Sequence, residues 1–105
     1  MKILFIAAGP ITWGSSRMRC YWVAQHMQDA TVITHDEVKR ANYLPPADVY
    51  IWQKYAIPEI IDRYSDARHY WDVCDPAWWW QPEESRETLR RVRGVVCSSM
   101  ALGYD

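Results

Sequence analysis

The sequence predicts an α/β domain in which helices cover both faces of a parallel β-sheet. Short runs of apolar or β-branched residues alternate with longer amphipathic segments along the chain. This alternation is typical of β–α–β units, whose right-handed crossovers produce a doubly wound parallel sheet. The opening segment, residues 2–8 (KILFIAA), is apolar without a helical stripe and is followed by Gly9 and Pro10. Such a run indicates a strand that is buried on both faces.

The remaining elements come in regular alternation. Four further short segments have the composition of strands: Ala30–Thr34, residues 48–53, Arg68–Val73 and Gly94–Cys97. Helices are expected at residues 16–28, 57–64 and 82–93, whereas the polar stretch 35–46 is expected to be a connection with about one helical turn. In the last of these helices the acidic residues come early and the basic residues late, as the helix dipole favours. Ser98 and Ser99 are expected to cap a further helix that is barely begun at Asp105, so the domain looks incomplete.

Length and composition indicate one domain, residues 1–105. The net charge of −1 and the pI near 6.3 lack the excess of basic residues that non-specific binding of nucleic acid requires. The three cysteines are widely spaced and odd in number, which favours reduced thiols over disulfides. Because no stretch resembles a signal peptide or a membrane span, we expect a cytoplasmic protein with no integral membrane segment.

Tryptophan is in large excess, with seven residues in the chain and three in a row at Trp78, Trp79 and Trp80. Three adjacent large rings cannot all point into one core, so at least one should lie against a partner, a ligand or another domain. Packing against another domain is the leading interpretation and stacking on a sugar ring the second. Membrane contact is disfavoured because no basic amphipathic segment accompanies the run.

The loop after the first strand is the first candidate site. It holds two glycines, two serines and two arginines: Gly9, Gly14, Ser15, Ser16, Arg17 and Arg19. A helix that begins here directs unpaired N–H groups and its positive dipole end over the sheet edge, where a phosphate would bind. In the alternative interpretation, the serines only cap the helix and the arginines pair with surface carboxylates. Neither glycine motif of the dinucleotide-binding or P-loop proteins is present.

The turn WDVCDP is the second candidate site. It places Asp72 at the end of a strand and Asp75 in the following turn, at the edge where open α/β sheets bind their ligands. Two carboxylates there could orient a sugar hydroxyl, or one could act as a general base. Alternatively, Asp75 only shapes a turn before Pro76, and Asp72 only holds a loop N–H group.

Other chemistry-bearing residues are weaker candidates. His26 and His69 are isolated and are expected to be packed or surface residues, whereas His35 follows the second strand near the ligand edge. Cys97 lacks a neighbouring base and is most simply a strand end. No metal-ligand spacing and no Ser–His–Asp arrangement is present, so we expect neither a metal nor a cofactor.

Three stretches, taken in order, resemble the N-terminal half of GT-B-fold glycosyltransferases of the family 4-like, group 1 type. They are MKILFIAAGP…GSSRMRCYWVAQHM, then ADVYIWQK with RHYWDVCDPAWW, and finally RRVRGVVCSSMAL. The resemblance implies a Rossmann-like, acceptor-side domain of an enzyme that transfers a sugar from a nucleotide-sugar donor to a hydroxyl acceptor. The nucleotide sugar would be a substrate, not a cofactor.

The resemblance also implies roles for individual residues. Gly9, Gly14, Arg17 and Arg19, with the two serines between them, would lie near the donor phosphates at an interdomain cleft. Asp72 and Asp75 would face the acceptor side of that cleft. In this family most donor contacts come from a C-terminal domain, and no segment of this chain resembles that domain. The chain alone is therefore expected to be inactive, with Trp78, Trp79 and Trp80 packed against the second domain.

Two other interpretations remain open. In the first interpretation, the chain is a self-sufficient, flavodoxin-like binding module for an anionic ligand or a protein partner, without catalytic activity. A homodimer is the other possibility, in which the exposed sheet edge and the tryptophan run replace the second domain.

Overall fold

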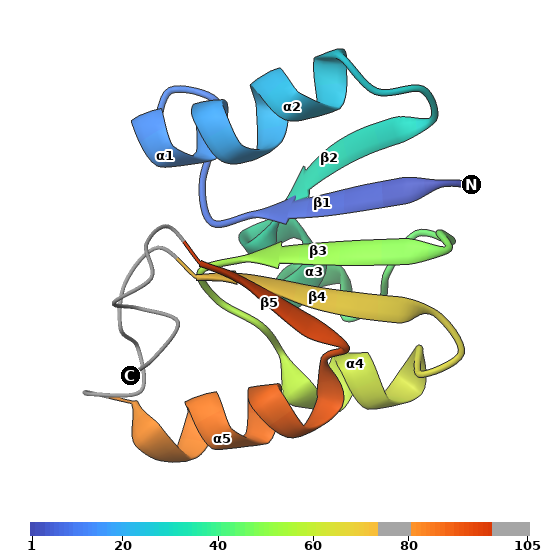
Figure 1. Ribbon diagram of the computed structural model, residues 1–105, viewed down its shortest axis with the longest axis vertical. Coiled ribbons are helices and arrows are strands. Elements are labelled where there is room, and N and C mark those ends of the chain that lie inside the picture. The colour runs from blue at the N-terminus through green and yellow to red at the C-terminus, as the bar shows by residue number, and fades with distance from the viewer. Residues whose placement is uncertain (74–80, 98–105) are drawn as a thin grey trace.

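The computed structural model describes residues 1–73 and 81–97, which form an α/β domain around one sheet of five parallel strands (Figure 1). The strands are β1 (Ile3–Ala7), β2 (Ala30–Thr34), β3 (Val49–Gln53), β4 (Arg68–Val73) and β5 (Gly94–Cys97). Their order across the sheet is β2-β1-β3-β4-β5, and every neighbouring pair is parallel. The predicted fold class is confirmed, and each strand lies within one residue of its expected bounds at either end.

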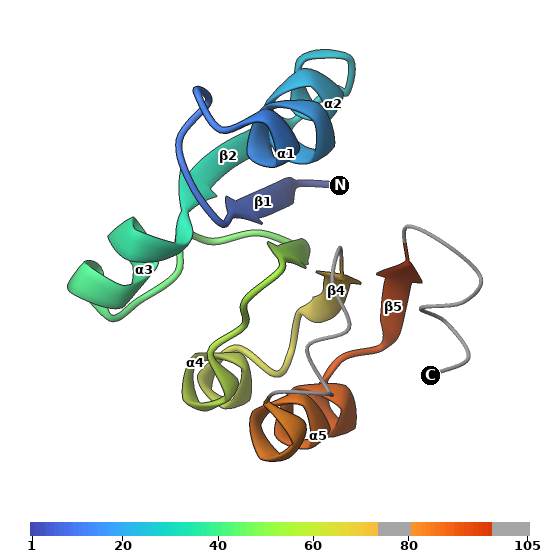
Figure 2. The ribbon, with the colours of Figure 1, turned by 90° about the vertical axis from the view of Figure 1, so that its left-hand side faces the viewer.

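Helices lie on both sides of this sheet (Figure 2). On one side, α1 (Gly14–Ser16), the π-helical segment η1 (Arg17–Tyr21) and α2 (Trp22–Gln25) run on without a break. We refer to these residues, 14–25, as the first helix. On the other side lie α3 (His35–Ala41), α4 (Pro58–Arg63) and α5 (Pro82–Arg91). Pro58 occupies the first turn of α4, as predicted.

Helix α3 is longer than the sequence suggested, because its ends are well capped. The side chain of Thr34 accepts a hydrogen bond from the backbone N–H of Glu37, which satisfies one of the free donors of the first turn. Asn42 ends the helix in the left-handed conformation, at a φ of 59°. The expectation of a connection with about one turn was therefore wrong for this segment.

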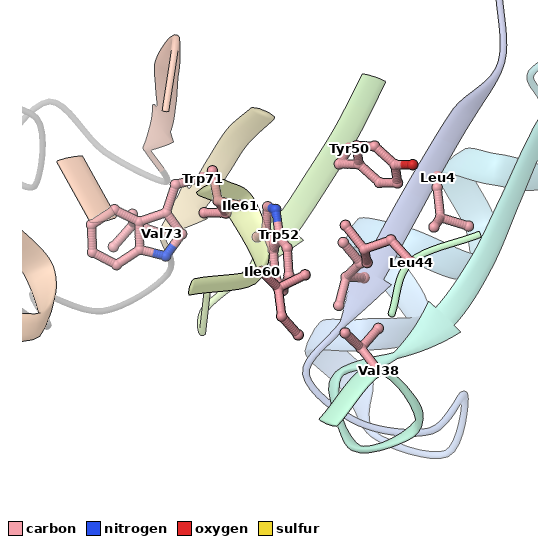
Figure 3. Packing of buried hydrophobic residues seen from close by; sticks show 10 residues of the cluster. Leu4, Val38, Leu44, Tyr50, Trp52, Ile60, Ile61, Trp71 and Val73 are labelled. Atoms are coloured by element: carbon pink, nitrogen blue, oxygen red, sulfur yellow. The ribbon is translucent and has the colours of Figure 1, made fainter. Parts of the chain in front are cut away.

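The main core lies between the sheet and helices α3, α4 and α5. Ten buried residues form it, as Figure 3 shows: Leu4, Ile6, Val38, Leu44, Tyr50, Trp52, Ile60, Ile61, Trp71 and Val73. A smaller cluster on the other face combines Phe5 and Ala7 with Cys20 and Ala24 of the first helix. Strand β1 supplies alternate residues to both clusters, which explains why its sequence is apolar throughout.

One polar group is built into the main core. The ring of His69 is 2% exposed and stacks on Tyr50 with 5.0 Å between centroids. The indole N–H of Trp52 donates to Nδ1 of His69 at 3.0 Å, so Nε2 carries the ring proton and donates to the carbonyl of Tyr64 at 2.9 Å. Burial lowers the pKa of His69, an effect that the hydrogen bond to Tyr64 opposes. His69 is thus a packed, neutral histidine.

This arrangement predicts a loss of stability in acid. Because the pKa of His69 is lower in the folded than in the unfolded chain, the unfolded state binds more protons below a pH of about 6.5, and acidification favours unfolding. We expect the free energy of unfolding, measured by urea denaturation, to fall between about pH 7.5 and pH 5.5. His69→Gln should show a smaller fall, whereas the exposed-site control His26→Gln should keep the wild-type dependence. An equal fall in His69→Gln would contradict this assignment.

Candidate functional site

The strand order places a topological switch point between β1 and β3. The chain leaves β1 through the first helix on one face of the sheet and leaves β2 through α3 on the opposite face. In open parallel sheets, ligands bind in the crevice at the carboxyl ends of the strands, where the order reverses. Figure 2 looks toward these strand ends. The loop after β1, the start of the first helix and the ends of β3 and β4 meet here.

Gln53, the last residue of β3, organises this edge. Its side-chain oxygen accepts hydrogen bonds from the backbone N–H of Ala8 at 2.8 Å and from the hydroxyl of Ser16 at 2.9 Å. The thiol of Cys20 approaches the same oxygen at 3.6 Å. The Ser16 hydroxyl in turn accepts from the backbone N–H of Gly9 at 3.0 Å. We call these five residues the Gln53 network; it ties the first loop and the first helix to the middle of the sheet.

Sequence analysis missed Gln53, although one signal was available. It is a polar residue at the end of a buried strand, and the side chain is fully buried. Its amide nitrogen has no hydrogen-bond partner. A buried amide donor without a partner is costly, and such groups concentrate at functional sites.

The expected serine cap is not found. The first helix begins at Gly14, and its capping position is Trp13, whose side chain makes no capping hydrogen bond. Ser16 lies inside the helix and is buried in the Gln53 network, while Ser15 is exposed. The prediction that either serine caps this helix was wrong, because Ser16 bonds to a residue far along the chain instead.

Arg19 and Asp72 form an ion pair across the sheet edge. The Nε of Arg19 donates to Oδ2 of Asp72 at 2.8 Å, and Nη2 donates to Oδ1. Only 8% of the Asp72 side chain and 26% of the Arg19 side chain are exposed. This two-pronged contact joins the first helix to β4. Asp75, Trp78, Trp79 and Trp80 lie outside the described residues, so the expectations for them stay predictions.

Arg17 differs from Arg19 although both lie in the π-helical segment. Its guanidinium lies over the ring of Trp22, 5.4 Å from the centroid, and it forms no ion pair with any of the described residues. Its Nε is buried and has no hydrogen-bond partner. Segments of π-helix occur frequently at functional sites. Arg17 is therefore an uncompensated positive charge near the start of a helix at the switch point.

The two glycines of the loop have different surroundings. Gly9 is buried, and a Cβ atom there would collide with the ring of Trp13. Gly14 has open space around its Cα. Neither glycine has a positive φ, so the backbone conformation requires glycine at neither position. The two positions differ in packing, which is tight only at Gly9.

Residues 1–73 and 81–97 contain no helix long and apolar enough to cross a membrane. They also contain no group of three or more His, Cys, Asp or Glu side chains arranged to hold a metal ion.

A scan against protein-family models, a search of curated proteins and a search of solved structures found no match to this chain. Its function must therefore be inferred from its own residues.

Because only Ser16 belongs to the Gln53 network, the two serines should contribute unequally to the stability of the fold. We expect Ser16→Ala to lower the free energy of unfolding by about 1–2 kcal/mol, because the N–H of Gly9 loses its acceptor inside the protein. Ser15→Ala, at the exposed neighbour, should change it by less than about 0.5 kcal/mol. Urea denaturation of both variants measures the difference. If both substitutions changed the free energy of unfolding equally, the hydrogen bonds of Ser16 would add no stability beyond that of an exposed serine.

The two glycines provide a second matched pair. Gly9→Ala should lower the free energy of unfolding by about 1 kcal/mol or more, since the added methyl group displaces the ring of Trp13. Gly14→Ala should leave it unchanged or raise it by about 0.5 kcal/mol, because alanine is the better helix former. Thermal unfolding followed by circular dichroism tests both. Stabilisation by Gly9→Ala would show that Trp13 does not depend on this space.

Proposed function

We propose that the switch-point edge binds the diphosphate of a nucleotide sugar, and that the chain is the acceptor-side domain of a glycosyltransferase. Sugar would pass from the nucleotide donor to a hydroxyl acceptor. The observation that carries the proposal is Arg17, an arginine without an ion-pair partner among the described residues, near the start of the first helix. The sequence resemblance to GT-B glycosyltransferases supplies the reaction class.

The chemistry of this edge suits an anion. The first-turn N–H groups of a helix have no acceptors within the helix, and the positive end of the helix dipole lies with them. Arg17 adds a full charge, and its contact with Trp22 restricts the guanidinium to one side of the helix. In a transfer reaction these groups would stabilise the departing diphosphate by fixed electrostatics. Gly9 leaves room in the loop for the ring of Trp13 and holds the loop to the first helix through its hydrogen bond to Ser16.

Asp72 would contribute on the acceptor side. A carboxylate has about four lone-pair positions, of which Arg19 uses two. One of the others would accept a hydrogen bond from the acceptor hydroxyl and orient it. In this role Asp72 positions the nucleophile, and Arg19 holds the carboxylate in place.

A second candidate is a binding module without catalytic activity. The strand order β2-β1-β3-β4-β5 favours it, because this is the order of flavodoxin-like domains, which bind ligands at the same switch point. Under this alternative the Arg19–Asp72 pair is purely structural, and the ligand is any phosphate-bearing molecule.

Titration with inorganic pyrophosphate and with uridine diphosphate, followed by calorimetry, tests the anion site. We expect Arg17→Gln to weaken both affinities about tenfold or more, which is the loss of about 1.4 kcal/mol of binding free energy. Arg86→Gln, which removes an exposed charge from α5, is the matched control and should bind as the wild type does. Unchanged affinities in Arg17→Gln would contradict the proposal.

The same titration, extended to nucleotide sugars, separates the two candidates. A glycosyltransferase domain should bind a nucleotide sugar more tightly than pyrophosphate, and the native gene product from its source cells should release nucleotide when a hydroxyl acceptor is added. Equal affinity for the two, with no release by the native gene product from its source cells, would favour the binding module.

A further inference from the structure

A second candidate site lies on the other side of the sheet from the first helix. A cavity of about 590 Å³ opens between α3, the loop from β3 to α4, and α5. Its volume is within the range of small-molecule pockets, about 300–1,000 Å³. None of the residues of the proposed anion site lines it, so a ligand in this cavity would be independent of that site.

The charges around this cavity are unbalanced. Glu59, Glu83 and Glu84 line it, and none of them has an ion-pair partner among the described residues. Glu87 and Arg91 also line it, but they neutralise each other at 2.8 Å. Lys39 is the remaining charged lining residue. Three carboxylates therefore face one ammonium group, and the cavity is net negative.

The aromatic lining adds a second feature suited to a cation. The rings of Tyr55 and His35 meet edge to face with 5.7 Å between centroids. The ammonium of Lys54 covers one face of Tyr55, 5.5 Å from the ring centroid, which leaves the other face for a ligand. Burial and the nearby charge of Lys39 lower the pKa of His35. The imidazole is thus neutral at physiological pH and adds no positive charge.

An unpaired polar atom lies next to the cavity. Ser85 is 3% exposed, and its hydroxyl has no hydrogen-bond partner. It borders a small void of about 30 Å³ whose lining includes Lys54, Tyr55, Ala56 and Glu84, and the last three of these residues also line the large cavity. A void of this size holds a single small polar group. A nitrogen-bound hydrogen of a ligand, placed there, would satisfy Ser85.

The carboxylates around the cavity are spread over two helices, and this distribution favours an extended ligand over a compact ion. The described residues contain no cluster that could hold a metal ion, and the carboxylates here come from the first turns of two helices, α4 and α5. Charge that is spread in this way matches a ligand that carries several positive charges along its length. We propose that the cavity binds an alkyl polyamine, with ammonium groups toward Glu83 and Glu84 and one amine in contact with Ser85.

Calorimetric titration with spermidine tests this proposal. We expect the double variant Glu83→Gln/Glu84→Gln to bind spermidine at least tenfold more weakly than the wild type. The control Asp29→Asn/Asp66→Asn removes the same charge from two exposed positions outside the cavity and should bind within about twofold of the wild type. Equal weakening in both double variants would overturn the proposal, as would the absence of any wild-type binding.

Two further measurements distinguish a polyamine site from general attraction of cations. Magnesium chloride at matched ionic strength should not displace spermidine, and full displacement would overturn the proposal. Ser85→Ala should weaken spermidine binding severalfold without lowering the thermal unfolding temperature, because the hydroxyl has no hydrogen-bond partner among residues 1–73 and 81–97. Unchanged affinity in Ser85→Ala would overturn the assigned contact.

Discussion

Three donors from two segments converge on the side-chain oxygen of Gln53: a backbone N–H of the first loop, and the hydroxyl of Ser16 and thiol of Cys20 from the first helix. The side chain of Gln53 is fully buried, so protein donors satisfy its oxygen in place of bulk solvent. This constraint fixes where the helix begins relative to β3. The positions of Arg17 and Arg19 at the switch point depend on it.

Two arginines only two residues apart have opposite surroundings. Arg19 points across the sheet edge to Asp72 and donates hydrogen bonds to both carboxylate oxygens through Nε and Nη2. Arg17 lies over Trp22, and a ring face cancels none of its charge. Helical geometry separates them, because positions two apart on a helix point in different directions. The edge therefore combines a rigid ion pair with an arginine that forms no ion pair among the described residues.

The strands could be predicted because each is a short apolar or β-branched run, which is a local property. Helix α3 was underestimated because Thr34 and Asn42 had to be recognised as caps in a polar stretch. The polar residue Gln53 at the end of a buried strand could have been noticed, but its bond to Ser16 could not be predicted, since the two residues lie 37 positions apart in the sequence. Arg19 and Asp72 were singled out separately, but their pairing depends on the strand order, which places β4 beside β3. The cavity between α3, the loop from β3 to α4, and α5 could not be predicted either, because its lining comes from segments far apart in the sequence.

The anchors of the first helix have a consequence for the order of assembly. The segment from β1 to β2 is synthesised before β3 and β4, yet Ser16 bonds to Gln53, 37 residues downstream, and Arg19 bonds to Asp72, 53 residues downstream. Until β3 and β4 are in the sheet, Ser16 lacks its hydrogen bond to Gln53, and Arg19 lacks its ion pair with Asp72. Contacts so distant in sequence form slowly, because the intervening chain must first be ordered. The segment from β1 to β2 therefore reaches its native packing only after the later strands β3 and β4 have joined the sheet.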